Sequence, residues 1–82
     1  MFCVYILQSE KDNSYYVGHS DNLDRRIEEH NREKNKYTRN KTPWKLAYGE
    51  FFNSRSEAMR REMEIKKKKR KNYIEWLINL AG

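Results

Sequence analysis

The first apolar run of the chain is hydrophobic at every position. Residues 2–7 read Phe-Cys-Val-Tyr-Ile-Leu, so both alternating sets of side chains are apolar. A strand with one solvated face alternates apolar and polar residues, whereas a strand covered on both faces does not. The run therefore predicts a central strand that is packed on both of its faces.

A second strand is predicted directly after a polar turn. Residues 9–14 are polar and turn-forming, and the β-prone segment Tyr15–Val17 that follows ends at Gly18. The two apolar runs are thus expected to form a hairpin. Because side chains alternate along a strand, Tyr16 shares a face with Gly18. The pairing register decides whether Tyr5 and Tyr16 meet.

The third segment has the pattern of an amphipathic helix. Residues 19–22 supply N-cap side chains, and the apolar spacing then continues from Leu23 to about Lys34. On a helical wheel, Arg26 and His30 flank the apolar stripe, whereas Arg25 points to water. The wheel therefore predicts that Arg26 and His30 are directed toward the sheet.

The remainder of the chain predicts one more strand and two more helical segments. Residues 35–43 are polar and turn-rich, and Trp44–Phe52 is aromatic and β-prone, with Gly49 as a bulge or a point of close approach. Ser54 begins a helix through a capping box, and a final helix carries apolar side chains from Tyr73 to Leu80. The expected class is α/β in the α+β sense: a three-stranded antiparallel sheet flanked by helices.

The boundary between the last two helices has no glycine or proline to mark it. One long helix is therefore an alternative. A straight helix would leave the last apolar face without packing on a chain of 82 residues, so we expect a break near residues 67–70. We expect residues 1–82 to form a single domain.

One carboxylate falls on the apolar side of the first of these helices. Glu62 lies between Ala58 and Ile65 on the helical wheel. A carboxylate placed there must be paired or must bind a metal, because burying it alone would cost several kcal/mol. From the residues alone, a structural salt bridge to Arg61 or Arg26 is the simpler interpretation.

The positive charge of the chain is concentrated in one segment. Residues 60–71 contain eight Lys and Arg against two Glu, which equals the net charge of +6 of the whole chain. This favours a polyanionic partner, with a merely solvated helix surface as the alternative. The single cysteine, Cys3, excludes an internal disulfide and a zinc cluster, and we expect a cytoplasmic protein with no membrane segment.

A family resemblance rests on these residues taken together. Cys3-Val4-Tyr5 is followed, with an offset of 11 residues, by Tyr16-Val17-Gly18, and then by an arginine, a histidine and a glutamate on predicted helices. This pattern resembles the GIY-YIG nuclease family, and within it the small standalone endonucleases. The likeness continues through Asn22-Leu23, Thr38-Arg39, Pro43-Trp44, Ile65-Lys66 and Leu77-Ile78. Cys3 stands where the family's first motif has glycine.

The resemblance implies a Mg²⁺- or Mn²⁺-dependent endonuclease that hydrolyses phosphodiester bonds, with DNA as the expected substrate and repair or recombination as the setting. It implies that Tyr5 takes a proton from the attacking water or directs it, that Arg26 steadies the phosphoryl charge, and that Glu62 is the metal ligand. The implied catalytic residues are Tyr5, Tyr16, Arg26, His30 and Glu62. The expected nucleic-acid contacts are His19, Arg39, Lys66, Lys67, Lys68, Lys69, Arg70 and Lys71.

Two other classes of function remain open from the sequence. A noncatalytic nucleic-acid-binding protein that retains the fold would need the basic surface but not Glu62. A basic protein-interaction module would bind nucleic acid without salt sensitivity or not at all. The sequence leaves open DNA against RNA, a monomer against a weak homodimer, and which of His19 and His30 assists the chemistry.

Overall fold

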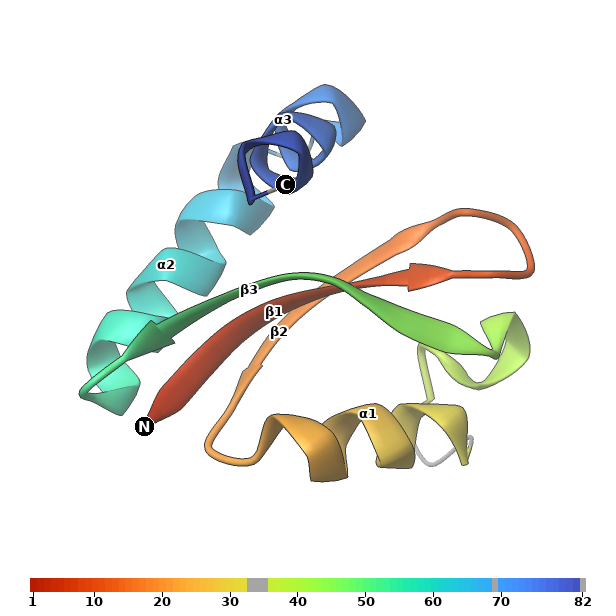
Figure 1. Cartoon of the computed structure of the whole chain (residues 1–82), viewed down its shortest axis with the longest axis horizontal. Coiled ribbons are helices and arrows are strands. Elements are labelled where there is room, and N and C mark those ends of the chain that lie inside the picture. Colours follow the sequence, from red (N-terminus) through yellow and green to blue (C-terminus); the bar gives the residue numbers. More distant parts are fainter. Residues whose placement is uncertain (33–35, 69, 82) are drawn as a thin grey trace.

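Three strands form the centre of the protein, and helices lie on both sides of them (Figure 1). The computed structural model describes residues 1–32, 36–68 and 70–81. Its elements in chain order are β1 (Phe2–Ser9), β2 (Tyr15–Ser20), α1 (Leu23–Asn31), the 3-10 turn η1 (Arg39–Lys41), β3 (Trp44–Phe52), α2 (Arg55–Lys68) and α3 (Lys71–Ala81). The expected α+β fold with a three-stranded antiparallel sheet is confirmed.

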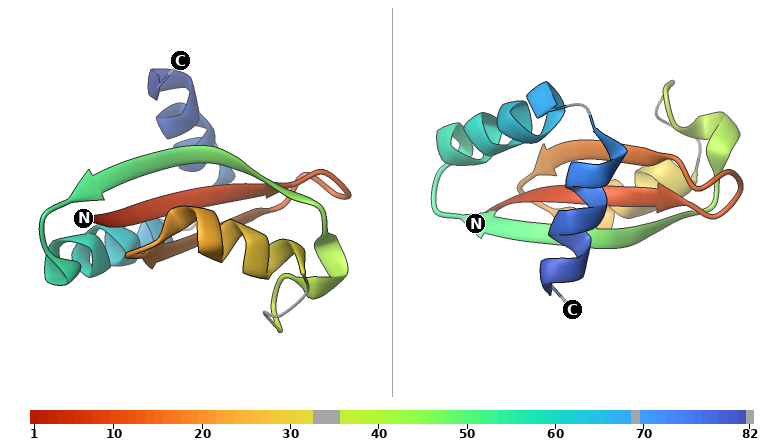
Figure 2. Two further views of the ribbon diagram at one scale, coloured as in Figure 1. Left: turned by 60° about the horizontal axis from the view of Figure 1, so that its bottom comes forward. Right: turned by 90° about the horizontal axis from the view of Figure 1, so that it is seen from above.

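Strand β1 is the middle strand, as its apolar run predicts. The strand order is β2-β1-β3, and β1 pairs antiparallel with both neighbours. Helix α1 lies on one face of the sheet, and α3 crosses the other face next to α2 (Figure 2). The side chains of Val4, Tyr5, Ile6 and Leu7 are completely buried. Both faces of β1 are therefore interior.

Alternation along β1 divides the interior into two clusters. On one face, Val4 and Ile6 pack with apolar side chains of α2 and α3, among them Ala58, Ile65 and Leu77. On the other face, the cluster consists of Cys3, Tyr5, Leu7 and Trp44, with Tyr16, Leu23 and Ile27 packed against it. Tyr5 thus belongs to the side of the sheet that α1 covers.

The hairpin register places Tyr5 directly opposite Gly18 and Leu7 opposite Tyr16. A Cβ atom on Gly18 would lie 2.6 Å from the Tyr5 hydroxyl oxygen and 2.8 Å from Cζ of the same ring. The Tyr5 ring therefore lies against bare backbone, which no other residue type would permit. Tyr5 and Tyr16 do meet, with ring centroids 6.3 Å apart.

Helix α1 has the phase that the sequence predicts. Asn22 caps it through its side-chain oxygen, which accepts a hydrogen bond from the Arg25 backbone N–H at 3.1 Å. His30 is buried, Arg26 is half-buried and Arg25 is exposed. The helix ends at Asn31, earlier than predicted, and Lys34 lies outside the described residues.

The end of α1 is attached to the start of β3 by one side chain. The Asn31 amide nitrogen donates to the Trp44 carbonyl oxygen at 3.1 Å, and the Asn31 amide oxygen accepts from the Trp44 backbone N–H at 2.6 Å. These are the two bonds that a residue on a neighbouring strand would make. The Trp44 indole N–H donates to the Thr38 carbonyl oxygen at 2.9 Å. The segment between α1 and β3 is therefore held at both ends.

The structure corrects one expectation for the second half of the chain and confirms another. The bulge is not at Gly49: the β1–β3 register shifts between Ile6 and Leu7, which leaves Ala47 as the extra residue. The break between the last helices is confirmed, since α2 ends at Lys68 and α3 begins at Lys71. Within the described parts of the chain, no helix is long and apolar enough to cross a membrane.

We expect Gly18→Ala to destabilise the fold by about 1–3 kcal/mol, because the added methyl group must displace the buried Tyr5 ring. Gly49→Ala is the matched control. A Cβ at Gly49 would meet its nearest neighbour, Cys3 Sγ, at an ordinary 3.6 Å. That substitution should be neutral or stabilising by up to about 1 kcal/mol. Urea denaturation of both variants measures the difference, and equal stabilities would contradict the packing described here.

Candidate active site

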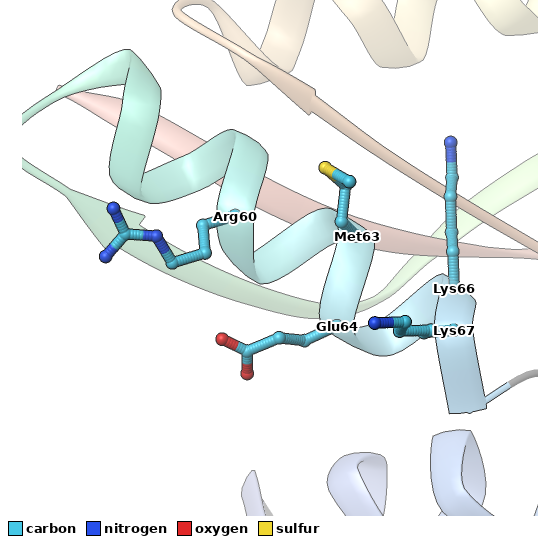
Figure 3. Close-up of a pocket in the computed structure, with 5 residues that line it drawn as sticks. All are labelled: Arg60, Met63, Glu64, Lys66 and Lys67. Carbon is cyan, nitrogen blue, oxygen red and sulfur yellow. The ribbon is translucent and has the colours of Figure 1, made fainter.

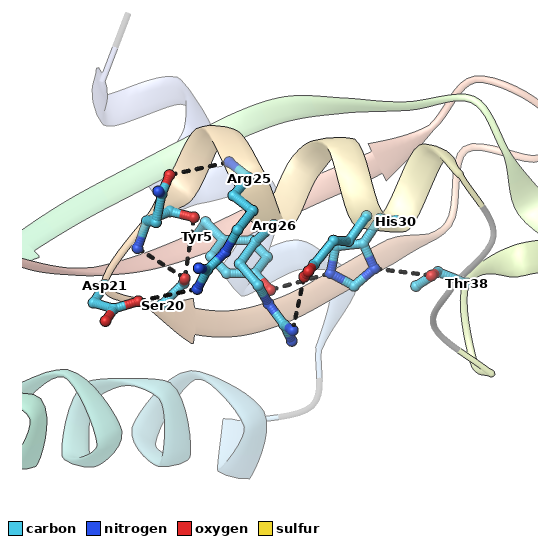
Figure 4. Close-up of polar contacts among 9 residues, drawn as sticks. Tyr5, Ser20, Asp21, Arg25, Arg26, His30 and Thr38 are labelled. Carbon is cyan, nitrogen blue, oxygen red and sulfur yellow. Dashed lines mark hydrogen bonds and ion pairs between the residues drawn. The ribbon is translucent and has the colours of Figure 1, made fainter.

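A chain of hydrogen bonds runs from Tyr5 through His30 to Thr38 (Figure 4). The Tyr5 hydroxyl lies 3.1 Å from His30 Nε2, and His30 Nδ1 lies 2.8 Å from Thr38 Oγ1. All three side chains are buried. A neutral imidazole has one donor and one acceptor nitrogen, so Tyr5 and Thr38 take opposite roles toward it. The arrangement can pass a proton between Tyr5 and His30 without moving either side chain.

Burial sets the resting protonation of this pair. It lowers the pKa of His30, and the nearby Arg26 charge lowers it further. It also raises the pKa of Tyr5, which the Arg26 guanidinium opposes without cancelling. Tyr5 is therefore a neutral phenol at neutral pH, and His30 is a neutral imidazole.

Arg26 projects from α1 toward the Tyr5 hydroxyl. Its interaction with that hydroxyl raises the pKa of Arg26, so the guanidinium is charged at any physiological pH. Arg26 Nη1 donates to Glu29 Oε1 at 3.3 Å. Arg26 Nε is buried and has no hydrogen-bond partner among the described residues. An unpaired buried donor is costly unless a further acceptor completes it, and a phosphate oxygen has the required chemistry.

Glu62 lies on α2, and both of its carboxylate oxygens have a side-chain partner. One carboxylate oxygen pairs with His19 Nδ1 on β2, and the other pairs with Lys66 Nζ one turn further along the helix. Burial alone would raise the pKa of Glu62, but Lys66 and His19 together lower it, so the group is ionised. The structural partners considered from the sequence are wrong. Arg61 pairs with Glu50 and Glu64, and Arg26 pairs with Glu29.

These groups reach the same place from opposite faces of the sheet. His19 is opposite Val4 in the register, on the side of α2, whereas Tyr5 and Gly18 lie on the side of α1. His19 bonds to Glu62 and lines a cleft that Arg26, from the other face, also lines. Strand β2 is an edge strand, and the side chains converge around that edge.

A cleft opens beside this edge. It has a volume of about 410 Å³ and is lined by His19, Ser20, Asp21, Arg25, Arg26 and Arg55. The three arginines come from both α1 and the start of α2, and Asp21 pairs with Arg25 and Arg55. The lining is thus predominantly cationic, which suits an anionic ligand.

The structure assembles most of the residues that the sequence singles out. Tyr16 lies next to His30, with ring centroids 4.7 Å apart. Arg39 is on η1, at the other end of the sheet from the start of α2, and does not join the group (Figure 1). Exposed basic side chains follow the corner between α2 and α3, namely Lys66, Lys67, Lys68, Arg70 and Lys71. Lys69 lies outside the described residues.

Two contributions to the site have no signal in the sequence pattern. Thr38 sits in a polar segment with no periodicity, and its burial depends on how that segment folds back onto His30. The pairing of His19 with Glu62 joins residues that are 43 positions apart, and it depends on the strand register and the position of α2 together. Neither is visible as a spacing.

The side chains at the site fit one kind of divalent cation better than another. Among the described residues, no group of three His, Cys, Asp or Glu side chains could hold a metal ion, so a zinc-type cage does not fit. An ionised carboxylate bonded to a residue of the cleft does fit Mg²⁺ or Mn²⁺, because Mg²⁺ keeps water ligands and takes phosphate oxygens. Lys66 is exposed and can move aside. Glu62 alone would then hold the ion.

Comparison with known proteins identifies relatives over most of the chain. The family model of the GIY-YIG catalytic domain matches residues 1–75. A UPF0213 protein of Staphylococcus haemolyticus is 53% identical over 64 residues, which cover 77% of this chain and 77% of that protein. A UPF0213 protein of Halobacterium salinarum is 46% identical over 67 residues, covering 80% and 86% respectively. The solution NMR structure of a UPF0213 protein from Bacillus halodurans has 40% identity and a TM-score of 0.63, covering 100% of this chain and 87% of that one.

The lowered pKa of His30 predicts a dependence of stability on pH. Below about pH 6.5 the imidazole of residue 30 takes up a proton in the unfolded chain. In the folded protein the pKa of His30 is lower, so the imidazole stays neutral there until the pH falls further. The free energy of unfolding therefore falls as the pH falls. His30→Gln removes this titration. Urea denaturation between about pH 7.5 and about pH 5 should therefore give a shallower profile for the variant. Parallel profiles would show that His30 is not held neutral.

Proposed function

The chain belongs to the GIY-YIG family, and on that premise we propose that it hydrolyses phosphodiester bonds in nucleic acid, with DNA as the substrate and Mg²⁺ or Mn²⁺ as the cofactor. The observation that carries this proposal is the geometry at the edge of β2. Tyr5 bonds to His30 there, and Arg26 lines a cationic cleft together with His19, the partner of Glu62. A base, a fixed cation and a metal-binding carboxylate are the groups that phosphodiester hydrolysis needs.

Tyr5 and His30 form the proton-handling part of the proposed mechanism. Tyr5 is protonated at rest and cannot act as a base until it loses that proton. His30 Nε2 is within hydrogen-bonding distance, so Tyr5 can pass its proton to His30 as it takes one from the attacking water. The bond between His30 and Thr38 keeps the imidazole oriented for this transfer.

Arg26 is placed to stabilise charge. Its half-buried guanidinium is fixed by Glu29 and lies beside Tyr5, so it needs no rearrangement when negative charge develops on the phosphoryl group. Arg26 lines the cleft, where its guanidinium can donate to a phosphate oxygen. The arginines of the cleft would hold neighbouring phosphates without regard to base sequence.

Glu62 would hold the divalent cation, which supplies Lewis-acid stabilisation of charge on the phosphate oxygens. His19 bonds to one carboxylate oxygen and fixes its direction, as an outer partner of a metal ligand does. Lys66 occupies the other oxygen and neutralises the carboxylate while no cation is bound.

A noncatalytic nucleic-acid-binding protein is the second candidate function. The observation that favours it is the pairing of both Glu62 oxygens with protein side chains, which a purely structural carboxylate would also show. The cleft and the basic corner would serve such a protein equally well. The two candidates differ in what the loss of the Glu62 charge does.

Arg26→Ala should reduce the cleavage rate by about 10²–10³-fold, the usual effect of losing one preorganised contact to a transition state, with little change in folding. Arg32→Ala is the matched control, because Arg32 is an exposed arginine at the opposite end of α1 that pairs only with Glu28 among the described contacts. Metal-dependent cleavage of a panel of linear and branched DNA measures both. Equal rates for the two variants would contradict the role of Arg26.

Glu62→Gln keeps the side-chain shape and removes the charge. We expect it to weaken Mg²⁺ binding and to reduce cleavage severely, while the affinity for nucleic acid stays equal or increases slightly through lost repulsion. Glu64→Gln, on the exposed side of the same helix, should behave like the wild type. Isothermal titration with Mg²⁺ is to be combined with cleavage assays and thermal melting.

The melting data separate the two candidate functions. If Glu62 only stabilises His19 and Lys66, Glu62→Gln lowers the melting temperature, and activity falls in proportion to the folded fraction. A destabilised Glu62→Gln protein with near-normal specific activity would overturn the metal role.

A further inference from the structure

The corner between α2 and α3 contains a second hollow, away from the β2 edge. Its volume is about 590 Å³, and its lining consists of Lys67, Lys68, Arg70, Asn72, Tyr73 and Trp76. Three of these side chains are cations, one is an amide and two are aromatic rings. None of the six is acidic. The hollow therefore combines positive charge with flat apolar surfaces.

The two aromatic rings are stacked and held in place. Tyr73 and Trp76 have ring centroids 5.8 Å apart and an interplanar angle of 27°. Arg61 Nη1 donates to the Tyr73 hydroxyl at 3.2 Å, and Lys68 Nζ lies 5.0 Å from the centre of the Tyr73 ring. Trp76 is nevertheless 55% exposed. One side of the indole packs on Tyr73, and much of the ring remains open to a ligand.

The other tryptophan shows what a structural indole looks like in this fold. Trp44 is 4% exposed, and its N–H donates to the Thr38 carbonyl oxygen. Trp76 has no comparable burial. An exposed indole beside three cations can accept a flat ring, and the cations favour a polyanion. Single-stranded nucleic acid offers both phosphates and flat bases, and bases stack on exposed aromatic side chains.

Side chains of α2 lead from this hollow toward Glu62. Lys67 also lines a neighbouring hollow of about 450 Å³ formed by side chains from successive turns of α2 (Figure 3). Lys66 lines that hollow as well, and Lys66 bonds to Glu62. From Glu62 to Lys68 the helix rises by about 9 Å. Two to three stacked base steps, at about 3.4 Å each, span that distance.

We propose that Tyr73 and Trp76 form a stacking platform for an unpaired base of the nucleic-acid substrate, with Lys67, Lys68 and Arg70 binding the adjoining phosphates. The inference rests on the proposed function in that nucleic acid is the ligand. It adds that the preferred substrate has an unpaired nucleotide a few positions from the bond that is cut, as at the junction of a duplex with a single strand. A blunt duplex keeps its bases stacked internally and cannot offer one.

Tryptophan fluorescence and binding affinity test the platform. The protein is titrated, with chelator present to prevent cleavage, with a DNA duplex that carries a single-stranded overhang and with a blunt duplex of the same sequence. We expect Trp76→Leu to bind the overhang duplex about 5- to 150-fold more weakly, which corresponds to about 1–3 kcal/mol for one stacked base, and the blunt duplex with unchanged affinity. Trp76→Phe retains an aromatic face and should recover most of the affinity.

Two further readouts keep the outcome unambiguous. Trp44 is buried, so fluorescence quenching by the overhang duplex should disappear in Trp76→Phe although binding persists. Leu80→Ala, an exposed change on the same helix, should alter neither affinity nor quenching. The platform is overturned if Trp76→Leu binds the overhang as tightly as the wild type, or if it weakens both duplexes equally.

The same data are independent of the nuclease proposal. Binding of the overhang through Trp76 by a protein that cleaves no DNA in Mg²⁺ would support the platform and overturn the nuclease function. Metal-dependent cleavage that is equally fast on blunt and overhang duplexes, without quenching of Trp76, would support the nuclease function and overturn the platform.

Discussion

The close contact of the Tyr5 ring with the backbone at Gly18 is the constraint on which the site depends. Because Gly18 has no side chain, the Tyr5 hydroxyl lies over the edge strand β2 instead of being pushed back into the interior. From there it reaches His30 on α1 and is influenced by Glu62 on α2. One missing methyl group therefore allows residues from both faces of the sheet to act on the same oxygen atom.

Charge and burial are distributed consistently around that oxygen. The neutral pair of Tyr5 and His30 occupies the buried side, where an ion would be costly. The charged Arg26 side chain lines the cleft, and the ionised Glu62 is bonded to His19, which lines it too, so solvent and ligands can compensate these charges. A negatively charged ligand would find positive charge already in place, and any proton transfer would take place away from bulk water. The cost of maintaining such groups is met by the apolar cover on both sides of β1.

Elements with a strong period were predictable from the sequence, and partners that depend on tertiary placement were not. The unbroken apolar run of β1 indicated a strand covered on both sides, and the helical wheel placed His30 toward the sheet and Arg25 toward water. Glu62 was identified as a partly buried carboxylate on α2, but its partners were not. Arg61 is its neighbour in the sequence, and Arg26 has the opposite charge. The actual partner His19 is brought to it by the register of an edge strand.

The position of the bulge also depends on tertiary placement and could not be predicted from the sequence. Gly49 was predicted as either a bulge or a point of close approach, because glycine tolerates irregular backbone, but the extra residue is Ala47. Thr38 is another such case, since a polar segment gives no period from which its burial could be inferred. The family resemblance draws attention to Thr38, but the hydrogen bond to His30 becomes visible only in three dimensions.

The double hydrogen bond of Asn31 to Trp44 has a consequence for how such a chain can vary during evolution. It ties the last residue of α1 to the first residue of β3, so the position of His30 does not depend on the length of the segment that joins them. Because the entropy of closing a loop grows only slowly with its length, insertions between Arg32 and Thr38 would cost little once both ends are fixed. A change of length there would therefore leave the geometry around Tyr5 as it is.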